Sequence, residues 1–336
     1  MNESTAAPTG DRLPLEPMDP QVRDIQPGGG IIIHLEQTWG RVRRCWLKAF
    51  RKGYVERMRA CRKGEPTGVP HEVLDSRDLK FHRNQTDCHW DASDDPFTWR
   101  DRLPFARVGM AELFVFLTLF WTPAAALLGV LLTRDIAPAW LTYVLWTADV
   151  ALWLLGVEML WFFRDPHRVV PTGPGEVISP ADGKVVHIED VQDEFIGGPA
   201  IEIGIFLSVF NVHINRSPVA ARVIGLKYKP GKYLNALRPE SARENEQLAI
   251  RLEEHTAPHR RMIVRQITGA IARRIVCWLK PGDELDRGEQ VGMIKLGSRT
   301  ELLLPKEDGL ELLTKVGDSV TAGSSVLARY RSGIST

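Results

Sequence analysis

Two long apolar stretches dominate the hydrophobic pattern of this chain. Residues 108–132 carry one charge, Glu112, and residues 138–163 carry two. As helices rising 1.5 Å per residue, they would each extend about 37 Å, enough to cross a bilayer with some tilt. We therefore expect a two-helix transmembrane hairpin within residues 105–163. A buried hairpin in a soluble protein is the weaker alternative, because both stretches are long and poor in charge.

Arginines at the two ends of this hairpin predict its orientation. Five flank its outer ends, namely Arg100, Arg102, Arg107, Arg164 and Arg168. Only Arg134 marks the turn between the two stretches. The positive-inside rule then places both chain ends in the cytoplasm, which predicts an inner-membrane protein with its catalytic domain on the cytoplasmic face.

Residues 164–336 change to short apolar segments that alternate with polar residues and are cut by Gly and Pro. Such a pattern is typical of β-strands, and seven are expected: 184–191, 200–207, 219–228, 262–268, 270–279, 291–296 and 301–304. One helix is expected near Glu240–Glu254, where Leu248 and Leu252 are four residues apart. We predict a mainly β fold, a small β-sandwich or barrel-type catalytic domain with one or two helices.

A weak internal repeat supports tight hairpins in this domain. Residues 281–288 and 316–323 each contain a Gly-Asp turn, then an apolar residue, then Gly six residues after the first Gly. This spacing suits the turns of a small sandwich or barrel.

Residues 1–100 predict a polar, partly disordered N-terminal extension. Residues 1–30 are rich in Pro, Gly and acids and lack apolar periodicity. The segment 41–63 holds ten Lys and Arg against one acid, with apolar residues at helical spacing. A basic amphipathic helix on an anionic membrane and a solvated basic helix explain this segment equally well.

Composition narrows the classes of partner and cofactor. The formal net charge is +1, which gives no reason to expect nucleic acid as the main partner. The four cysteines are far apart in the sequence and form no CxxC pair, so neither a disulfide framework nor a zinc ribbon is expected. No residue pattern calls for a metal.

Three segments of the β domain carry residues of catalytic type. They contain Asp182 in a Pro-Gly turn, His213 at a strand end and Ser298 in a Gly-Ser dipeptide. Each alone is more simply a structural residue, yet together they could form a triad. Ser298 lies in no GxSxG elbow, which disfavours an α/β-hydrolase.

The order of four motifs is more specific than any one of them. FFRDP at 162–166 is followed by SPADGKV at 179–185, FNVHINRSP at 210–218 and LGS at 296–298. This series behind a membrane hairpin resembles the phosphatidylserine decarboxylase proenzymes, most closely their compact prokaryotic branch. The resemblance covers roughly residues 105–330.

This resemblance implies a self-processing, pyruvoyl-dependent enzyme. The chain would cut itself between Gly297 and Ser298, with Asp182, His213 and Ser298 as the processing triad. Ser298 would become a covalent pyruvoyl group, the only cofactor implied, at the start of a 39-residue α chain that stays with the β chain. The substrate would be phosphatidylserine in the membrane, converted to phosphatidylethanolamine and CO₂. Whether the enzyme forms a homo-oligomer is left open.

One departure and two alternatives qualify this interpretation. Some family members carry a second histidine, proposed to act in decarboxylation, where this chain has Phe210. A non-catalytic, membrane-tethered β-sandwich that binds lipid or a partner would keep the fold without cleavage. A Ser-His-Asp hydrolase would instead keep a reactive Ser298 hydroxyl. Three arginines, Arg164, Arg216 and Arg299, are candidates for the lipid phosphate, although a structural or surface role is the simpler explanation for each.

Overall fold

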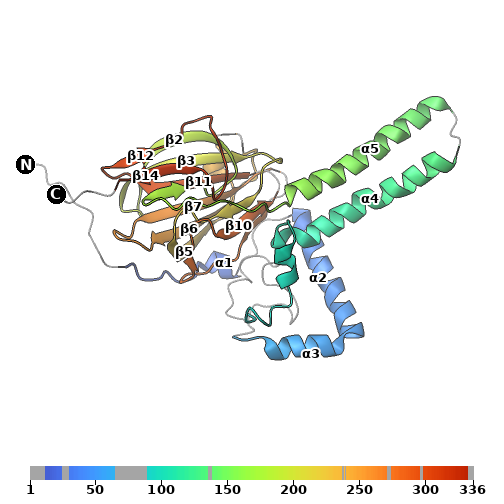
Figure 1. Cartoon of the computed structure of the whole chain (residues 1–336), viewed down its shortest axis with the longest axis horizontal. Helices are drawn as coiled ribbons and strands as arrows, with labels where there is room; N and C mark the ends of the chain where they lie inside the picture. Colours follow the sequence, from blue (N-terminus) through green and yellow to red (C-terminus); the bar gives the residue numbers. More distant parts are fainter. Residues whose placement is uncertain are drawn as a thin grey trace, which may run out of the picture.

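The computed structural model describes residues 12–24, 30–64, 89–134, 138–236, 238, 240–270, 274–295 and 298–331. A β domain lies at one end of the molecule, and a helical hairpin projects from its side (Figure 1). Two further helices follow in order: α2 runs away from the base of the hairpin, and α3 lies at its far end (Figure 1). The predicted mainly β domain preceded by a two-helix hairpin is confirmed.

The β domain is built on one curled antiparallel sheet of eight strands in the order β13-β2-β3-β11-β7-β6-β5-β9. The strands are β2 (Gly183–Asp193), β3 (Gly198–Leu207), β5 (Ala221–Lys229), β6 (Gln247–Glu254), β7 (Arg261–Thr268), β9 (Glu284–Leu285), β11 (Ser298–Pro305) and β13 (Ser319–Val320). Two three-stranded sheets complete the domain. One has the order β1-β14-β12, with β1 (Glu176–Ile178), β14 (Val326–Tyr330) and β12 (Leu310–Leu312). The other has the order β4-β10-β8, with β4 (Ile214–Arg216), β10 (Gln290–Lys295) and β8 (Arg274–Cys277).

These sheets form two equivalent halves. Strands β1 to β3 and β11 to β14 make one half, and β4 to β10 make the other. The eight-stranded order is symmetric under this correspondence, with the β11–β7 pair at its centre, and the two small sheets are equivalent. The second half is therefore inserted between β3 and β11 of the first.

Matching hydrogen bonds confirm this approximate two-fold relation. The Gly323 N–H donates to the Ser179 carbonyl at 2.9 Å, and the Gly288 N–H donates to the Ser217 carbonyl at the same distance. Both glycines have positive φ, 75° and 80°, which side chains disfavour. The repeat noted in the sequence at 281–288 and 316–323 is thus a pair of equivalent turns.

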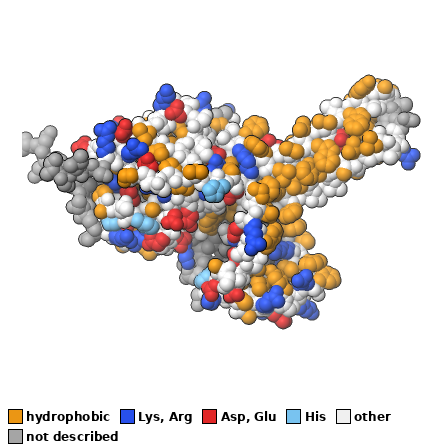
Figure 2. All heavy atoms as spheres, in the orientation of Figure 1, with side chains coloured by type: hydrophobic (Ala, Val, Ile, Leu, Met, Phe, Trp, Pro, Cys, Tyr) orange, Lys and Arg blue, Asp and Glu red, His pale blue; other side chains and the backbone are white. Residues whose placement is uncertain are grey.

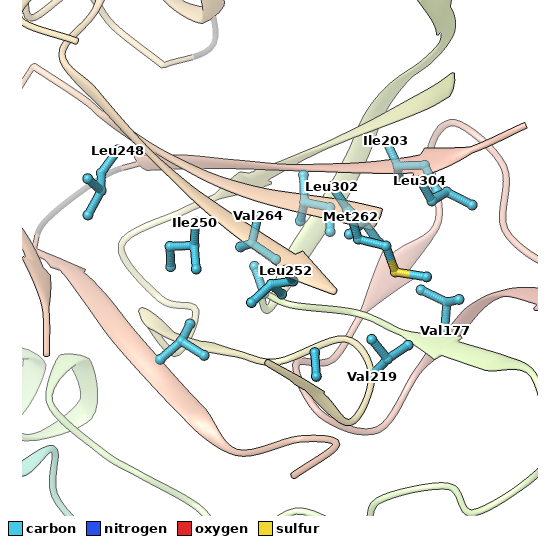
Figure 3. Close-up of a cluster of buried hydrophobic side chains, with 14 of the residues drawn as sticks. Val177, Ile203, Val219, Leu248, Ile250, Leu252, Met262, Val264, Leu302 and Leu304 are labelled. Atoms are coloured by element: carbon cyan, nitrogen blue, oxygen red, sulfur yellow. The ribbon is translucent and has the colours of Figure 1, made fainter. Parts of the chain in front are cut away.

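The main core lies on one face of the eight-stranded sheet (Figure 3). Alternate residues of the central strands supply it, as in Ile203 of β3, Val264 of β7 and Leu302 of β11, all fully buried. The opposite face of these strands carries charged residues instead.

The segment expected to be a helix is mostly a strand. Helix α6 spans only Ser241–Glu244, and residues 247–254 form β6. Leu248 and Leu252 fit a strand as well as a helix, because positions two and four apart share a strand face. Ile250 between them is also fully buried, so every second residue faces the core, as in a strand.

The hairpin consists of α4 (Met110–Thr133) and α5 (Ala139–Phe162), close to the predicted bounds. Both helices are long and apolar enough to span a membrane, with mean hydropathies of 2.1 and 1.5 over their most apolar stretches. Apolar side chains cover much of the visible surface of the hairpin (Figure 2). Its base packs on the β4-β10-β8 sheet through a second core that includes Val108, Leu113, Phe162, Val212 and Met293.

The N-terminal extension contains α1 (Pro20–Asp24), α2 (Gly30–Phe50), α3 (Lys52–Cys61) and the short 3₁₀ helices η3 (Thr98–Arg102) and η4 (Arg107–Gly109). Part of the stretch expected to be disordered packs on the β domain. The Glu16 N–H donates to the Ile224 carbonyl at 2.9 Å, and Val22 is fully buried in the main core. The burial of Val22 and the hydrogen bond from Glu16 to β5 hold this segment against the β domain. Residues 1–11 and 25–29 lie outside the described residues.

Candidate active site

Ser298 is the first residue of β11, at the centre of the large sheet. It lies opposite Leu207 of β3 on one side and Thr268 of β7 on the other. Its side chain is fully buried, and within the described part of the chain its hydroxyl has no hydrogen-bond partner. A buried polar atom without a partner is costly, so its presence suits a reactive rather than a structural role. Its predicted partner in the cleavage site, Gly297, lies outside the described residues.

His213 lies just before β4 and is fully buried. Its ring packs on Phe162 of α5, with the centroids 4.4 Å apart. Nδ1 lies 2.9 Å from the Asn211 carbonyl oxygen. Because a carbonyl can only accept, Nδ1 carries the hydrogen of the neutral ring and Nε2 is the basic nitrogen. Burial lowers the pKa of His213 to about 4, so the ring is neutral near pH 7.

Asp182 lies in the turn between β1 and β2, as the SPADG sequence predicts. Its carboxylate accepts two hydrogen bonds of 2.9 Å from Arg168 and one of 2.8 Å from the Ala322 N–H. Among the described residues it therefore bonds to Arg168 and Ala322 rather than to His213. The Asn211 carbonyl, and not Asp182, fixes the tautomer of His213 in this structure.

Asn215 links the three segments that carry these residues. Its side-chain amide donates to the Thr300 hydroxyl at 2.9 Å and to the Pro180 carbonyl at 3.3 Å. Its own oxygen accepts from Gln266 at 2.9 Å. Each of the three hydrogen-bonded residues lies two positions from a predicted one: Pro180 from Asp182, Asn215 from His213 and Thr300 from Ser298. The structure therefore brings the three predicted residues to one region. The sequence analysis missed Asn215, although it lies inside the quoted FNVHINRSP motif.

Both helices of the hairpin also reach this region. Lys295, three residues before Ser298, forms a buried ion pair with Glu112 near the start of α4. Its ammonium also lies 3.2 Å from the Val108 carbonyl oxygen. The base of the hairpin is thus tied to the strand that leads into the predicted cleavage site.

The end of α5 holds the loop before His213. The Phe210 carbonyl accepts hydrogen bonds from the Trp161 indole at 3.0 Å and from the Arg164 guanidinium at 2.9 Å. The Phe210 side chain is 63% exposed at this junction. The residue that replaces the second histidine of some family members therefore supplies an apolar surface beside the hairpin and no proton.

A buried carboxyl, Glu246, is a second residue that the sequence analysis did not single out. Its backbone carbonyl accepts a hydrogen bond from the Thr268 N–H at 3.0 Å. Thr268 in turn lies directly beside Ser298 in the sheet. The Glu246 carboxyl accepts from the Tyr228 hydroxyl at 3.0 Å, and burial raises its pKa to about 7. The raised pKa of Glu246 could not be predicted from the sequence, since it depends on burial in the fold.

A charged cluster occupies the sheet face opposite Ser298, beside a cavity of about 750 Å³. His187, Glu202 and Glu301 approach one another closely enough to hold a metal ion. Arg265 already pairs with both carboxylates, at 3.1 and 2.6 Å, and Arg299 lies 3.0 Å from Glu301. A divalent cation would have to displace or oppose these two guanidinium groups, so the donor set does not fit a metal.

All three candidate arginines for lipid phosphate have structural partners, which are carboxylates for Arg299 and Arg216 and the Trp161 and Phe210 carbonyls for Arg164. Arg299 belongs to the charged cluster, and Arg216 pairs with Asp165 at 3.0 Å. Arg164 lies at the end of α5, its guanidinium 4.0 Å from the Trp161 ring centroid. Of the three, Arg164 has the position best suited to a lipid headgroup.

Comparison with known proteins identifies the family of this chain. The family model of phosphatidylserine decarboxylase matches residues 157–328. A phosphatidylserine decarboxylase proenzyme of Rhodopirellula baltica is 49% identical over 255 residues, which cover 76% of this chain and the whole of that protein. Proenzymes of the same name from Nitrosomonas eutropha and Symbiobacterium thermophilum are 43% and 44% identical, over 55% and 56% of this chain and 84% and 86% of theirs.

The fold and the matched region define a decarboxylase that is made as a proenzyme. The chain belongs to the phosphatidylserine decarboxylase family.

Proposed function

We propose that this chain decarboxylates phosphatidylserine to phosphatidylethanolamine, using a pyruvoyl group that it makes from its own Ser298. Membership of the family supports the reaction. The observation that carries the cofactor proposal is Ser298 itself, fully buried and without a hydroxyl partner among the described residues. The ladder to β3 and β7 would hold whatever group forms at this position.

In the proposed self-cleavage, the neutral His213 acts as general base through Nε2. The Ser298 hydroxyl attacks the Gly297 carbonyl and gives its proton to His213, and the peptide bond becomes an ester. Elimination across Cα–Cβ of residue 298 then breaks the ester and releases the Gly297 carboxylate. The dehydroalanine left at residue 298 takes up water and loses ammonia, which leaves a ketone. Asp182 acts as a positioning residue, because it bonds to Arg168 and Ala322.

A pyruvoyl group at residue 298 would react with the amine of the substrate and accept the electrons released when CO₂ leaves. The chain's own contribution is to bury this position. The packing of Phe162 on His213 and the Asn215 hydrogen bonds hold the surrounding groups in place.

The membrane side of the proposal rests on the hairpin. Two helices able to span a bilayer enter the β domain next to the site, and the arginine distribution favours the cytoplasmic face of the inner membrane. Substrate would then reach the site from the headgroup layer without leaving the bilayer. Arg164 at the end of α5 is the proposed contact for the lipid phosphate.

Intact mass under denaturing conditions tests the cleavage. The purified chain should give a fragment covering residues 298–336, lighter than the serine-started peptide by the change from amine to ketone. Ser298→Ala should remain full length and release no CO₂ from phosphatidylserine vesicles. Ser324→Ala, in the other Gly-Ser dipeptide of the C-terminal region, is the matched control and should cleave normally. A wild-type chain that stays full length and inactive in membranes would contradict the proposal.

A further inference from the structure

Helix α2 exposes a stripe of large apolar side chains. Trp39, Val42, Trp46 and Phe50 are spaced by three, four and four residues, so they share one face of the helix. They are 39%, 58%, 52% and 72% exposed. Exposed aromatic stripes of this kind mark a surface that contacts another phase or molecule.

The stripe is not the face that packs α2 onto the protein. Leu47 is 7% exposed and packs with Val55 and Met58 of α3. The Arg43 guanidinium lies 5.1 Å from the centroid of the Phe97 ring. The inner face of α2 is thus occupied, and the stripe remains as a second apolar surface.

Basic residues lie on the opposite face of α2 from the stripe. Arg41, Arg44 and Lys48 lie on the same helix, and the segment 41–63 holds ten Lys and Arg against Glu56 alone. An apolar aromatic stripe on one face and basic residues on the other are typical of a helix that lies in the plane of an anionic lipid surface, which favours this partner over a protein groove or a neutral bilayer.

The position of α2 matches this partner. The helix contacts α4 and, in Figure 1, runs away from the base of the hairpin and across its direction. Apolar side chains on this lobe lie on the side from which the hairpin projects (Figure 2). With the hairpin across a bilayer, α2 would therefore lie in the plane of the headgroup layer.

We propose that α2 is an in-plane anchor, with Trp39, Val42, Trp46 and Phe50 in the interface of an anionic membrane and its basic face turned towards the water, where its positive charge attracts the anionic surface. The proposal rests on the membrane position of the hairpin, not on the decarboxylation chemistry. The anchor fixes how the β domain is tilted over the bilayer, and it attracts anionic lipid, the charge class of the substrate, to the entrance of the site.

Spin labels on the full chain in lipid nanodiscs test this position. Cys45, Cys61 and Cys88 are replaced by Ser, and one label is placed through Trp46→Cys, Lys48→Cys or Val150→Cys. Collisions with oxygen report lipid, and collisions with a water-soluble nickel chelate report solvent. In discs containing phosphatidylglycerol we expect oxygen to dominate at residues 46 and 150, and nickel at residue 48. In discs of phosphatidylcholine alone, the oxygen signal at residue 46 should fall.

The label at Val150, exposed in the middle of α5, separates the two proposals. If collisions with oxygen dominate at residue 150 but collisions with nickel dominate at residue 46, the anchor proposal is overturned and the membrane position of the hairpin stands. Nickel at both positions would overturn the membrane position of the hairpin and the anchor with it. A residue 46 shielded from both reagents would mean that a second copy of the chain covers the stripe, which also overturns the proposal.

Discussion

At the scale of single residues, the protonation of His213 decides when the site is competent. Burial lowers its pKa to about 4, below that of an exposed histidine, so protonation opposes folding. The stabilisation from the neutral ring is complete above the ordinary histidine pKa and is lost as the pH falls towards 4. As the proposed general base, His213 therefore needs no deprotonation step at neutral pH.

This predicts a flat pH profile for self-cleavage. The rate constant for loss of freshly synthesised precursor should vary little between about pH 6 and pH 8, and should fall only as the pH approaches the lowered pKa. Time courses on denaturing gels at each pH measure it. A midpoint near that of an exposed histidine would show that Nε2 is not the base or that the ring is solvated during the reaction.

Asn215 is the residue whose loss should separate folding from cleavage. Asn215→Ala leaves Thr300, Gln266 and the Pro180 carbonyl short of a buried partner, which should cost about 1–3 kcal/mol of unfolding free energy. Misplacement of the three segments should also slow cleavage by up to roughly a hundredfold. Denaturant unfolding and the cleavage time course measure the two effects.

Ser217→Ala is the matched control for this variant. Ser217 is equally buried, and its hydroxyl donates to the Val219 carbonyl at 2.7 Å without touching β11. We expect a similar loss of stability with near-normal cleavage. Equal slowing in both variants would mean that general destabilisation, not positioning, explains the effect of Asn215→Ala.

At the scale of elements, the hairpin contributes to the candidate site as well as being the proposed membrane anchor. The buried Lys295–Glu112 pair joins α4 to the end of β10. Lys295→Met leaves the Glu112 carboxylate buried without this cation, which should cost about 3–5 kcal/mol and slow cleavage. The double variant Glu112→Leu, Lys295→Met removes both charges and should recover most of the stability. Thermal unfolding and the cleaved fraction in detergent measure this; wild-type cleavage in the single variant would refute the coupling.

Most elements could be predicted because their patterns are local. The two apolar stretches and five of the seven alternating segments correspond to α4, α5 and strands at nearly the expected bounds, whereas β8 is shorter than the expected 270–279 and β11 longer than the expected 301–304. The segment around Leu248 and Leu252 failed because a spacing of four fits both periods. The exposed stripe of α2 needed the structure, since the sequence cannot tell which apolar face of a helix is already packed.

The site was predictable only as far as motifs point to it. Asp182, His213 and Ser298 could be named from their segments. The bonds of Asp182 to Arg168 and Ala322 could not, because Ala322 lies 140 residues further along the chain, on the other side of the inserted second half. The raised pKa of Glu246 likewise depends on burial by distant strands.

At the scale of the whole molecule, the two halves are alike in fold and unlike in chemistry. Ser179 and Ser217 occupy equivalent turns, each donating its hydroxyl hydrogen to the carbonyl two residues on at 2.7 Å. Three residues beyond these serines, one half has Asp182 and the other has Ala220. The duplicated framework thus supplies the rigid sheet, and only one of its two turns carries the acid.

The insertion of one half inside the other also governs what a single cut can separate. Residues 298–331 contribute β11, β13 and β14, which pair with β3, β7, β2 and β1 from the other side of the cut. Breaking the bond before Ser298 would divide the polypeptide without dividing the folded domain, since the strands of the short chain are hydrogen-bonded between strands of the long one. The new chain end could not diffuse away, and it would remain throughout the life of the enzyme where it was made.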